Sequence, residues 1–247
     1  MRCETVQVLS NEKIATGIYL LTLPFPHKAR PGQFVMLKVP HSATLLARPI
    51  SICDVKDDKL ILLYQVVGRG TGEFSRLREG DPITVTGPVG NGFPLDEVSG
   101  KVALVGGGVG VAPLVYTGKI LKERGIKVDV HVGYRDETFL TGEFTLCTDN
   151  LCVSTESGAV GNKGFVTGTL HPSDYDFVFC CGPTPMMKAV AAQCEEARVP
   201  LYVSLENKMG CGIGGCRTCT CTDKTGHNLR TCVEGPVFRG EEIDFDA

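Results

Sequence analysis

The sequence lacks the features that would assign a protein to a membrane, to secretion or to nucleic acid. No apolar run approaches the roughly 18 to 20 residues that cross a bilayer, so we expect any membrane attachment to come through a partner. The first ten residues, MRCETVQVLS, are polar and alternating rather than an apolar signal segment, and we expect a cytoplasmic protein. The net charge of -3 gives no electrostatic case for binding nucleic acid. No repeat, low-complexity tract or long linker divides the chain.

Cysteine, in contrast, is well represented, with 12 residues among 247. Four of them near the C-terminus, Cys211, Cys216, Cys219 and Cys232, form a C-x4-C-x2-C-x12-C array. The opening triplet matches the plant-type [2Fe-2S] pattern, in which one short loop supplies three thiolates and a distant residue supplies the fourth. Glycines in this loop allow the backbone to curl tightly and to turn its N–H groups toward the sulfurs. The array therefore predicts an iron-sulfur cluster.

Two other roles of these cysteines stay open. A tetrahedral zinc site is one, although zinc sites usually pair cysteines as C-x2-C at both ends. Disulfides are the other, and a chain without a secretion signal favours them less. Cys221, two residues after the third candidate ligand, could compete for the cluster, but the triplet is complete without it. The remaining cysteines are expected to be mostly small buried hydrophobic residues, and they are Cys3, Cys53, Cys147, Cys152, Cys180, Cys181 and Cys194.

Residues 1–98 are strand-like throughout. Short segments rich in Val, Ile, Leu and Thr are separated by Gly, Pro, Asn or Asp, which predicts strands joined by turns. These segments are 5–23, 32–40, 48–55, 59–68 and 82–90. The expected architecture is an antiparallel β-barrel or sandwich.

The pattern changes over residues 99–205, where apolar strands alternate with helical segments. The segments are strands at 101–107, 127–134 and 177–183, with helices at 113–125 and 185–199. Such repeats predict a parallel α/β sheet with right-handed crossovers. Residues 206–247 then form a small C-terminal segment that carries the cysteine array. The fold class is therefore β followed by α/β, in two domains and a cluster segment.

Two glycine-containing turns mark the α/β domain. The first lies between an apolar strand and a helix, where backbone N–H groups and the positive helix end would face a dinucleotide pyrophosphate. From Gly108 it is G-x-G-x-x-P rather than G-x-G-x-x-G, so a turn that serves only strand-to-helix packing stays open. The second turn also follows a strand and starts a helix, so both would line one crevice at the carboxyl edge of the sheet. Their residues are Gly106, Gly107, Gly108 and Gly110 in the first and Cys181, Gly182 and Pro183 in the second.

In the first domain, Arg48-Pro49-Ile50-Ser51 stands between apolar segments, and a Gly-Arg-Gly-Thr turn at 68–71 follows a strand. An arginine can clamp a pyrophosphate, and a neighbouring hydroxyl can hydrogen-bond a flavin ring or its ribityl chain. A surface arginine and an ordinary hairpin turn are the alternatives.

The order of these motifs resembles the ferredoxin-NADP reductase superfamily. Within it, the sequences at 204–221 (SLENKMGCGIGGCRTCTC) and 232–245 (CVEGPVFRGEEIDF) are similar to the electron transfer subunits of type B dihydroorotate dehydrogenase. The resemblance covers essentially the whole chain, and the cysteine spacing with the preceding Glu-Asn-Lys-Met-Gly is its most specific part. That family binds FAD, one [2Fe-2S] cluster and NAD.

Matching the motifs to this family assigns its cofactor sites. The four cysteines of the array become cluster ligands, residues 1–98 become the FAD domain, and the two glycine turns of the domain at 99–205 would hold NAD. No side chain of this chain is expected to be catalytic. The implied FAD contacts are Arg48, Pro49, Ile50, Ser51, Leu63, Tyr64, Gln65, Gly70 and Thr71.

The resemblance also implies a partner. A separate FMN-containing subunit would oxidise dihydroorotate to orotate in pyrimidine (UMP) biosynthesis and send its electrons through this chain to NAD⁺, in a heterotetramer with two of each subunit. The ending IDFDA is also similar to diaphorase subunits of a hydrogenase, a sulfite reductase or a ferredoxin-NADP transhydrogenase. A zinc-binding interaction module with a reductase-like body is a third alternative.

The preference for NAD over NADP comes largely from the family that the chain resembles, and the end of the strand at 127–134 bears on it. Residues 134–137, Tyr-Arg-Asp-Glu, lie about 20 residues beyond the glycine run, where an acid would bond the ribose 2'-hydroxyl of NAD. Arg135 could instead bind a 2'-phosphate. We expect NAD, with Cys181 packing near the nicotinamide rather than reacting with it.

Overall fold

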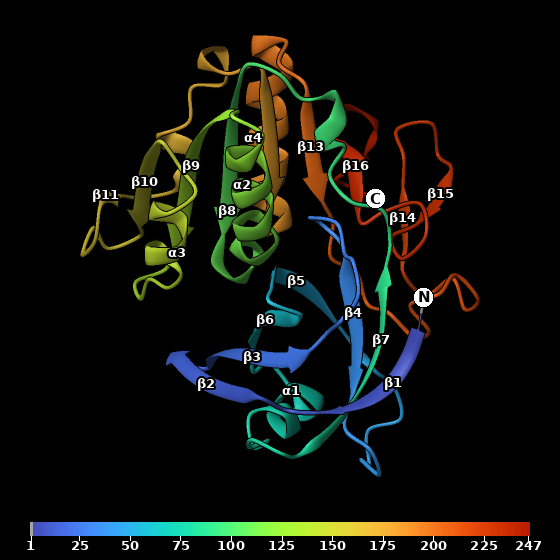
Figure 1. Ribbon diagram of the computed structural model, residues 1–247. Coiled ribbons are helices and arrows are strands. Elements are labelled where there is room, and N and C mark those ends of the chain that lie inside the picture. The colour runs from blue at the N-terminus through green and yellow to red at the C-terminus, as the bar shows by residue number, and fades with distance from the viewer. Residues whose placement is uncertain (1) are drawn as a thin grey trace.

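The first seven strands form one curled antiparallel sheet, a half-barrel, in the computed structural model, which describes residues 2–247 (Figure 1). Their order across the sheet is β1-β7-β4-β5-β6-β3-β2. Side-chain alternation accounts for the fold, because in β7 every second residue is buried while those between stay partly exposed. The strands are β1 (Arg2–Gln7), β2 (Ser10–Ala15), β3 (Ile18–Pro24), β4 (Phe34–Lys38), β5 (Arg48–Lys56), β6 (Lys59–Gln65) and β7 (Pro82–Val89).

Helix α1 (Arg69–Phe74) packs against this half-barrel through its last residue. The ring of Phe74 meets that of Tyr64 edge to face, with the centroids 5.9 Å apart. Asn11 donates to the carbonyls of Phe74 and Leu77 at 2.8 and 3.0 Å, which satisfies the end of the helix. These contacts fix the position of the Gly-Arg-Gly-Thr turn at which the helix begins.

The α/β domain is built on a second seven-stranded sheet, in the order β11-β10-β9-β8-β12-β13-β16 (Figure 1). The strands pair in parallel except for β16, which is antiparallel to β13. They are β8 (Lys101–Gly107), β9 (Lys127–Tyr134), β10 (Asn150–Thr155), β11 (Asn162–Lys163), β12 (Phe177–Cys181), β13 (Leu201–Ser204) and β16 (Val237–Arg239). The helices are α2 (Ala112–Glu123), α3 (Thr141–Thr145) and α4 (Thr184–Ala197), with 3-10 turns η1 (Leu95–Glu97), η2 (Gly108–Val111), η3 (Val166–Gly168), η4 (Pro172–Asp174) and η5 (Gly240–Glu242).

This sheet is covered on both faces, which explains why its strands are continuous apolar runs. In β8, Val102 and Leu104 belong to the core cluster that contains α2, whereas Ala103 and Val105 belong to the cluster that contains α4. The α2 face also meets the half-barrel, since Lys119 forms an ion pair of 3.2 Å with an aspartate of β5. The predicted parallel α/β domain is confirmed.

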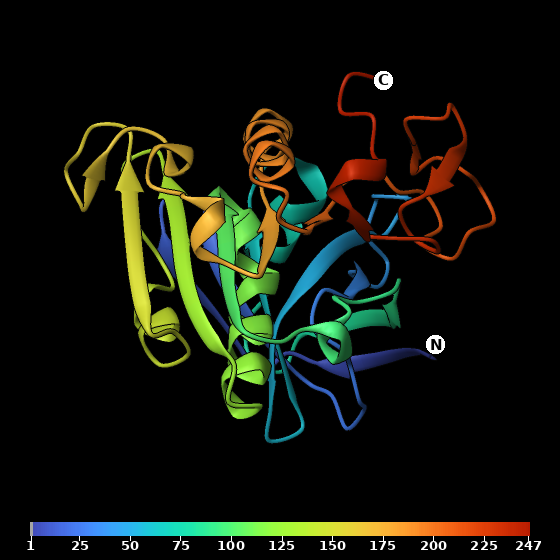
Figure 2. The same ribbon diagram turned by 90° about the horizontal axis from the view of Figure 1, so that it is seen from above.

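The C-terminal segment carries a hairpin of β14 (Thr220–Thr222) and β15 (Asn228–Arg230) and then adds β16 to the α/β sheet. Seen from above, this segment lies at the opposite end of the molecule from β10 and β11 (Figure 2). Asn91 joins it to the first domain, because its side chain donates to the carbonyls of Glu234 and Val237 and accepts the N–H of Val237. The cluster segment is thus anchored to both domains. The domain limits at 98/99 and 205/206 remain predictions.

None of the helices described for residues 2–247 combines the length and the hydrophobicity that crossing a bilayer requires.

Candidate functional site

A cleft of about 470 Å³ lies where the half-barrel, the α/β domain and the C-terminal segment meet. Most of the predicted flavin contacts line it, and these are Arg48, Pro49, Ile50, Ser51, Leu63, Tyr64, Gln65 and Thr71. The structure therefore brings the two separate motifs of the first domain together. It also adds residues that the sequence analysis missed, namely Phe34, Val67, Val109, Ala112, Leu205, Glu206, Asn207, Lys208, Met209 and Pro236. For 206–209, the Glu-Asn-Lys-Met run before the cysteine array was the available signal.

Gly70 lies outside the lining of this cleft but determines where Arg48 can be. A Cβ atom on Gly70 would fall 2.5 Å from Nε of Arg48, so the guanidinium rests directly on this glycine. The same guanidinium donates to the carbonyl of Leu46 at 2.7 Å. The hydroxyl of Thr71 accepts the N–H of Val67 at 3.0 Å and so closes the adjacent turn. A fixed cation beside this turn suits one end of a diphosphate.

The two glycine turns of the α/β domain are in direct backbone contact. A Cβ on Gly110 would lie 2.6 Å from Cα of Gly182 and 2.7 Å from the carbonyl oxygen of Cys181. A Cβ on Gly107 would lie 2.6 Å from the sulfur of Met186 and 3.0 Å from Cδ of Pro183. The two turns thus lie against each other at the carboxyl edge of the sheet, and a side chain at either glycine would separate them. The crevice for NAD stays a prediction.

The thiol of Cys181 is completely buried at this junction. Burial raises the pKa of Cys181 well above its ordinary value, and the nearby carboxylate of Glu206 raises it further. A thiol that stays protonated is a poor nucleophile, which supports a packing role for this residue. Glu206 lines the cleft and is exposed there. The protein around it still removes enough water to raise the pKa of its carboxyl group.

The candidate cluster ligands form two pairs. Cys211 and Cys216 make one, because the N–H of each donates to the sulfur of the other at 3.4 Å. The hydroxyl of Thr218 also donates to Cys216 at 3.2 Å, and these contacts, those of Thr218 first, lower the pKa of Cys216 to about 6. Cys219 and Cys232 make the second pair, and burial together with Cys219 raises the pKa of Cys232 to about 11. The first pair thus lies nearer the surface, and the second pair is buried.

This pairing bears on which metal group the site fits. Within residues 2–247, no three His, Cys, Asp or Glu side chains come close enough together for a single metal ion. A tetrahedral zinc ion needs all four sulfurs at about 2.3 Å from one point. A [2Fe-2S] cluster instead takes two thiolates on each of its two irons. The two pairs therefore fit [2Fe-2S] better than zinc. Cys221 is engaged elsewhere, since its thiol donates to the carbonyl of Leu229 at 3.6 Å.

The inner cysteine pair and the cleft share a wall. Cys219 and Cys232 pack in one small apolar cluster with Phe34, and Met209 packs against the same cluster. Phe34 and Met209 also line the cleft. Phe34 and Met209 thus contact both the cleft and the inner cysteine pair.

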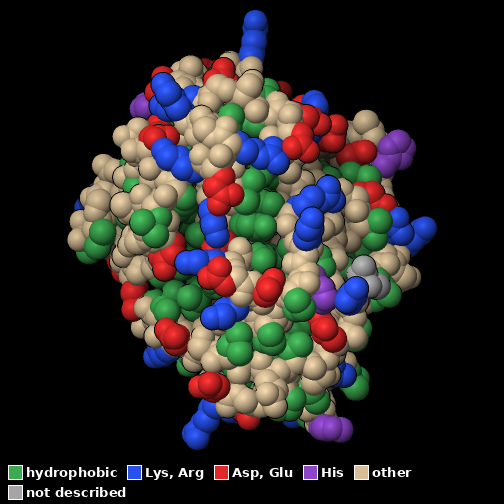
Figure 3. Space-filling view, in the orientation of Figure 1, with side chains coloured by type: hydrophobic (Ala, Val, Ile, Leu, Met, Phe, Trp, Pro, Cys, Tyr) green, Lys and Arg blue, Asp and Glu red, His purple; other side chains and the backbone are tan. Residues whose placement is uncertain are grey.

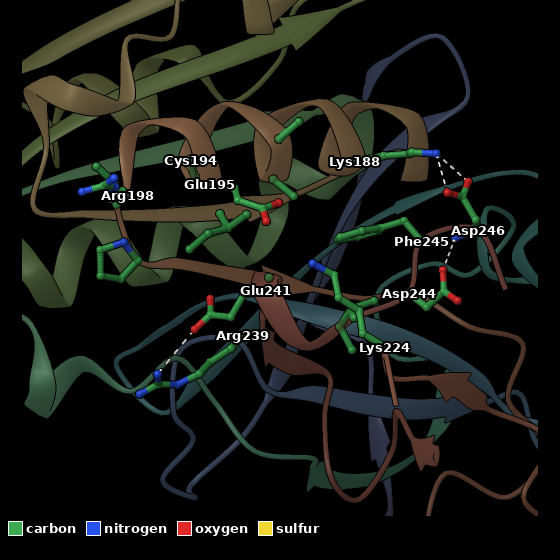
Figure 4. A pocket seen from close by; sticks show the side chains of 17 residues that line it. Lys188, Cys194, Glu195, Arg198, Lys224, Arg239, Glu241, Asp244, Phe245 and Asp246 are labelled. Atoms are coloured by element: carbon green, nitrogen blue, oxygen red, sulfur yellow. Dashed lines mark hydrogen bonds and ion pairs between the residues drawn. The ribbon is translucent and has the colours of Figure 1, made fainter. Parts of the chain in front are cut away.

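A second cavity, also of about 470 Å³, lies between α4 and the last residues of the chain (Figure 4). Lys188 on α4 pairs with Asp246 of the last residues, and Arg239 pairs with Glu241 two positions along the chain. None of the predicted site residues lines it. Charged side chains of both signs are interspersed on the face of the molecule shown in Figure 3.

The chain is similar to known proteins. The family model for the iron-sulfur cluster binding domain of dihydroorotate dehydrogenase B matches residues 206–244. A Clostridium acetobutylicum protein named dihydroorotate dehydrogenase B (NAD(+)), electron transfer subunit, is 46% identical over 96% of this chain and 95% of its own length. Its namesake from Clostridium perfringens is 44% identical over 97% of both chains.

Solved structures show the same fold. A chain from the structure of an NADH-dependent reduced ferredoxin-NADP oxidoreductase superposes with a TM-score of 0.88 at 34% identity, covering 98% of this chain and 90% of its own. A ferredoxin NADP+ reductase from Neisseria gonorrhoeae superposes with a TM-score of 0.67 at 14% identity, over 80% of this chain and 92% of its own.

Proposed function

Because the chain belongs to the family of dihydroorotate dehydrogenase B electron transfer subunits, we propose that it conducts electrons from a catalytic subunit through a [2Fe-2S] cluster and FAD to NAD⁺. The catalytic subunit would oxidise dihydroorotate to orotate in pyrimidine biosynthesis. The observation that carries the proposal is the wall of Phe34 and Met209 common to the inner cysteine pair and the cleft. With this common wall, the two redox groups would lie next to each other in one chain.

The chemistry requires a converter between two kinds of electron carrier. Nicotinamide exchanges a hydride and an iron-sulfur cluster exchanges one electron at a time, and FAD, when bound, can do both. The residues of this chain bind and orient. Arg48 would hold the flavin diphosphate, the two glycine turns would hold NAD, and the four cysteines would hold the cluster. No acid or base is needed.

The partner would carry FMN and would dock at the cysteine loop, with two of each subunit in the complex. This loop presents apolar side chains to solvent, with Ile213 52% and Val233 43% exposed. Cys216 is also exposed there. Exposed apolar patches mark protein interaction sites. A partner docked here would lie close to the cluster, which would shorten the path between the cofactors of the two subunits.

The test is an anaerobic affinity purification of the chain from its own cells, followed at once by an assay of NADH formation from dihydroorotate and NAD⁺. Activity together with an FMN-containing partner supports the proposal. A complex that ignores dihydroorotate contradicts the pathway but not the electron-transfer architecture. Two matched variants test whether the electrons pass through the cluster. Cys219→Ser should abolish NADH formation from dihydroorotate and preserve NADH oxidation by a flavin-reactive dye, whereas Cys221→Ser should preserve both.

A further inference from the structure

Hydrogen-bond donors gather on the outer cysteine pair, Cys211 and Cys216. Besides the two N–H contacts that these cysteines make with each other, the N–H of Ile213 donates to the sulfur of Cys211 at 3.4 Å. One side chain joins the backbone donors, because the hydroxyl of Thr218 donates to the sulfur of Cys216 at 3.2 Å. Within residues 2–247, no other hydroxyl donates to a sulfur of the four candidate ligands.

The backbone turn before Thr218 directs it onto this sulfur. Arg217 has a φ of 58°, a left-handed conformation that residues other than glycine rarely adopt. This conformation turns the chain back, so that the residue after Arg217 faces the sulfur of the residue before it. The hydroxyl of Thr220 donates to the carbonyl of Arg217 at 2.6 Å and holds the turn. Such a conformation persists only where the surrounding contacts fix it.

A glycine provides the space for the contact between Thr218 and Cys216. A Cβ atom on Gly210 would lie 3.1 Å from the sulfur of Cys216 and 3.4 Å from the hydroxyl oxygen of Thr218. The first distance is tighter than nine in ten real Cβ contacts, so a side chain at position 210 would press on the hydrogen-bonded pair. The loop is therefore built to keep this hydroxyl against this sulfur.

A hydroxyl on a ligand sulfur acts on an iron-sulfur cluster through charge. Reduction adds one electron and no proton, so the negative charge on the sulfurs increases. A hydrogen bond to a more negative acceptor is stronger, and the hydroxyl of Thr218 would therefore stabilise the reduced state more than the oxidised state. Hydrogen bonds to the sulfurs are among the features that set the reduction potential of such a cluster. The proton stays on the threonine oxygen throughout.

We propose that the hydroxyl of Thr218 raises the reduction potential of the [2Fe-2S] cluster, an inference that rests on the proposed function. Thr218 acts through the sulfur of Cys216, so it tunes the cluster and is not a catalytic residue. Cys216 is exposed, whereas the inner pair borders the cleft. The hydroxyl therefore acts on the side of the cluster that faces a docked partner, and it would favour the acceptance of an electron there.

The experiment is an anaerobic potentiometric titration of the purified full-length protein, in which electron paramagnetic resonance reports the reduced cluster. Thr218→Val keeps the shape of the side chain and removes the hydroxyl. Because a hydrogen bond to a charged group changes an equilibrium constant about 10-fold, this variant should lower the potential by about 59 mV, the one-electron equivalent. Thr218→Ser, which keeps the hydroxyl, should restore the potential of the unaltered protein. Thr222→Val, the same replacement in β14, should leave it unchanged.

An unchanged potential in Thr218→Val, at the iron content of the unaltered protein, would overturn the proposal while the electron-transfer function survives. An equal fall in Thr218→Ser would also overturn it, because the hydroxyl would then not be the cause. If Thr218→Val does not retain iron, Thr218→Ala, which also lacks the hydroxyl, takes its place in the comparison. If the unaltered protein shows no [2Fe-2S] signal on reduction, the proposed function fails as well.

Discussion

The contact between the two glycine turns makes Gly110→Ala a direct test of the NAD site. The new methyl group would lie 2.6 Å from Cα of Gly182 and 2.7 Å from the carbonyl oxygen of Cys181. Real Cβ atoms do not approach other atoms this closely, and both neighbours are backbone atoms that cannot rotate away. The turns must therefore move apart by several tenths of an ångström.

The expected cost has two parts. Overpacking a well-packed site costs about 1 to 3 kcal/mol of unfolding free energy. The second part is functional, because misplacing a binding group by about 1 Å can cost about 100-fold in rate, so kcat/KM for NADH should fall about 10-fold or more. The loss should fall mainly on NADH, since the predicted flavin contacts lie on the half-barrel and only Val109 and Ala112 line the cleft from the region of Gly110.

The assay is NADH-driven dye reduction, with thermal unfolding and flavin content measured on the same samples. Gly142→Ala is the matched control, because Gly142 lies in α3 and a Cβ there would meet nothing within 4 Å. That substitution should leave activity unchanged and should stabilise the protein by about 0.5 to 1 kcal/mol. If Gly110→Ala behaved like this control, the argument for a shared NAD crevice would be refuted.

Three further predictions follow from single contacts. Gly70→Ala should displace the guanidinium of Arg48 and weaken FAD binding about 10-fold, since a charge-assisted contact is lost; full flavin retention on dialysis would argue against the clamp. Burial lowers the pKa of His131 below 6.5, so the unfolded chain binds the proton more readily and the unfolding free energy should decrease as the pH falls below 6.5. His131→Gln should reduce that dependence in denaturant titrations, and an identical pH profile would contradict it. Asn91→Ala should cost about 1 to 3 kcal/mol and speed amide exchange at Val237, and unchanged exchange would count against the anchor.

Local sequence signals predict many of the strands and helices, but not α1, α3, β10 or the hairpin of β14 and β15. The alternation of apolar and polar residues predicts strands such as β7. The two glycine turns, each at the end of a strand, predict the contact between 106–110 and 181–183. The cysteine spacing likewise predicts a loop whose N–H groups face sulfur, as the contacts of Cys211 and Cys216 show.

Features that depend on long-range register could not be predicted. Nothing in the three residues of β16 indicates that they pair antiparallel with β13, 33 to 37 positions earlier in the chain. The double role of Phe34, in the cleft and beside the cysteines, arises only when the half-barrel and the C-terminal segment meet. Glu137 is a candidate ribose ligand by spacing alone, and only the folded structure shows its bond to Thr16.

In the proposed function, one chain holds FAD and a [2Fe-2S] cluster close enough to exchange electrons. Its most direct test is an anaerobic NADH titration of the purified protein, followed by flavin absorbance and by electron paramagnetic resonance. We predict that the flavin bleaches and the signal of a reduced [2Fe-2S] cluster appears, and that Cys219→Ser keeps the bleaching but loses the signal. A protein that contains stoichiometric zinc, or a cluster that stays oxidised while the flavin is fully reduced by NADH, would contradict it.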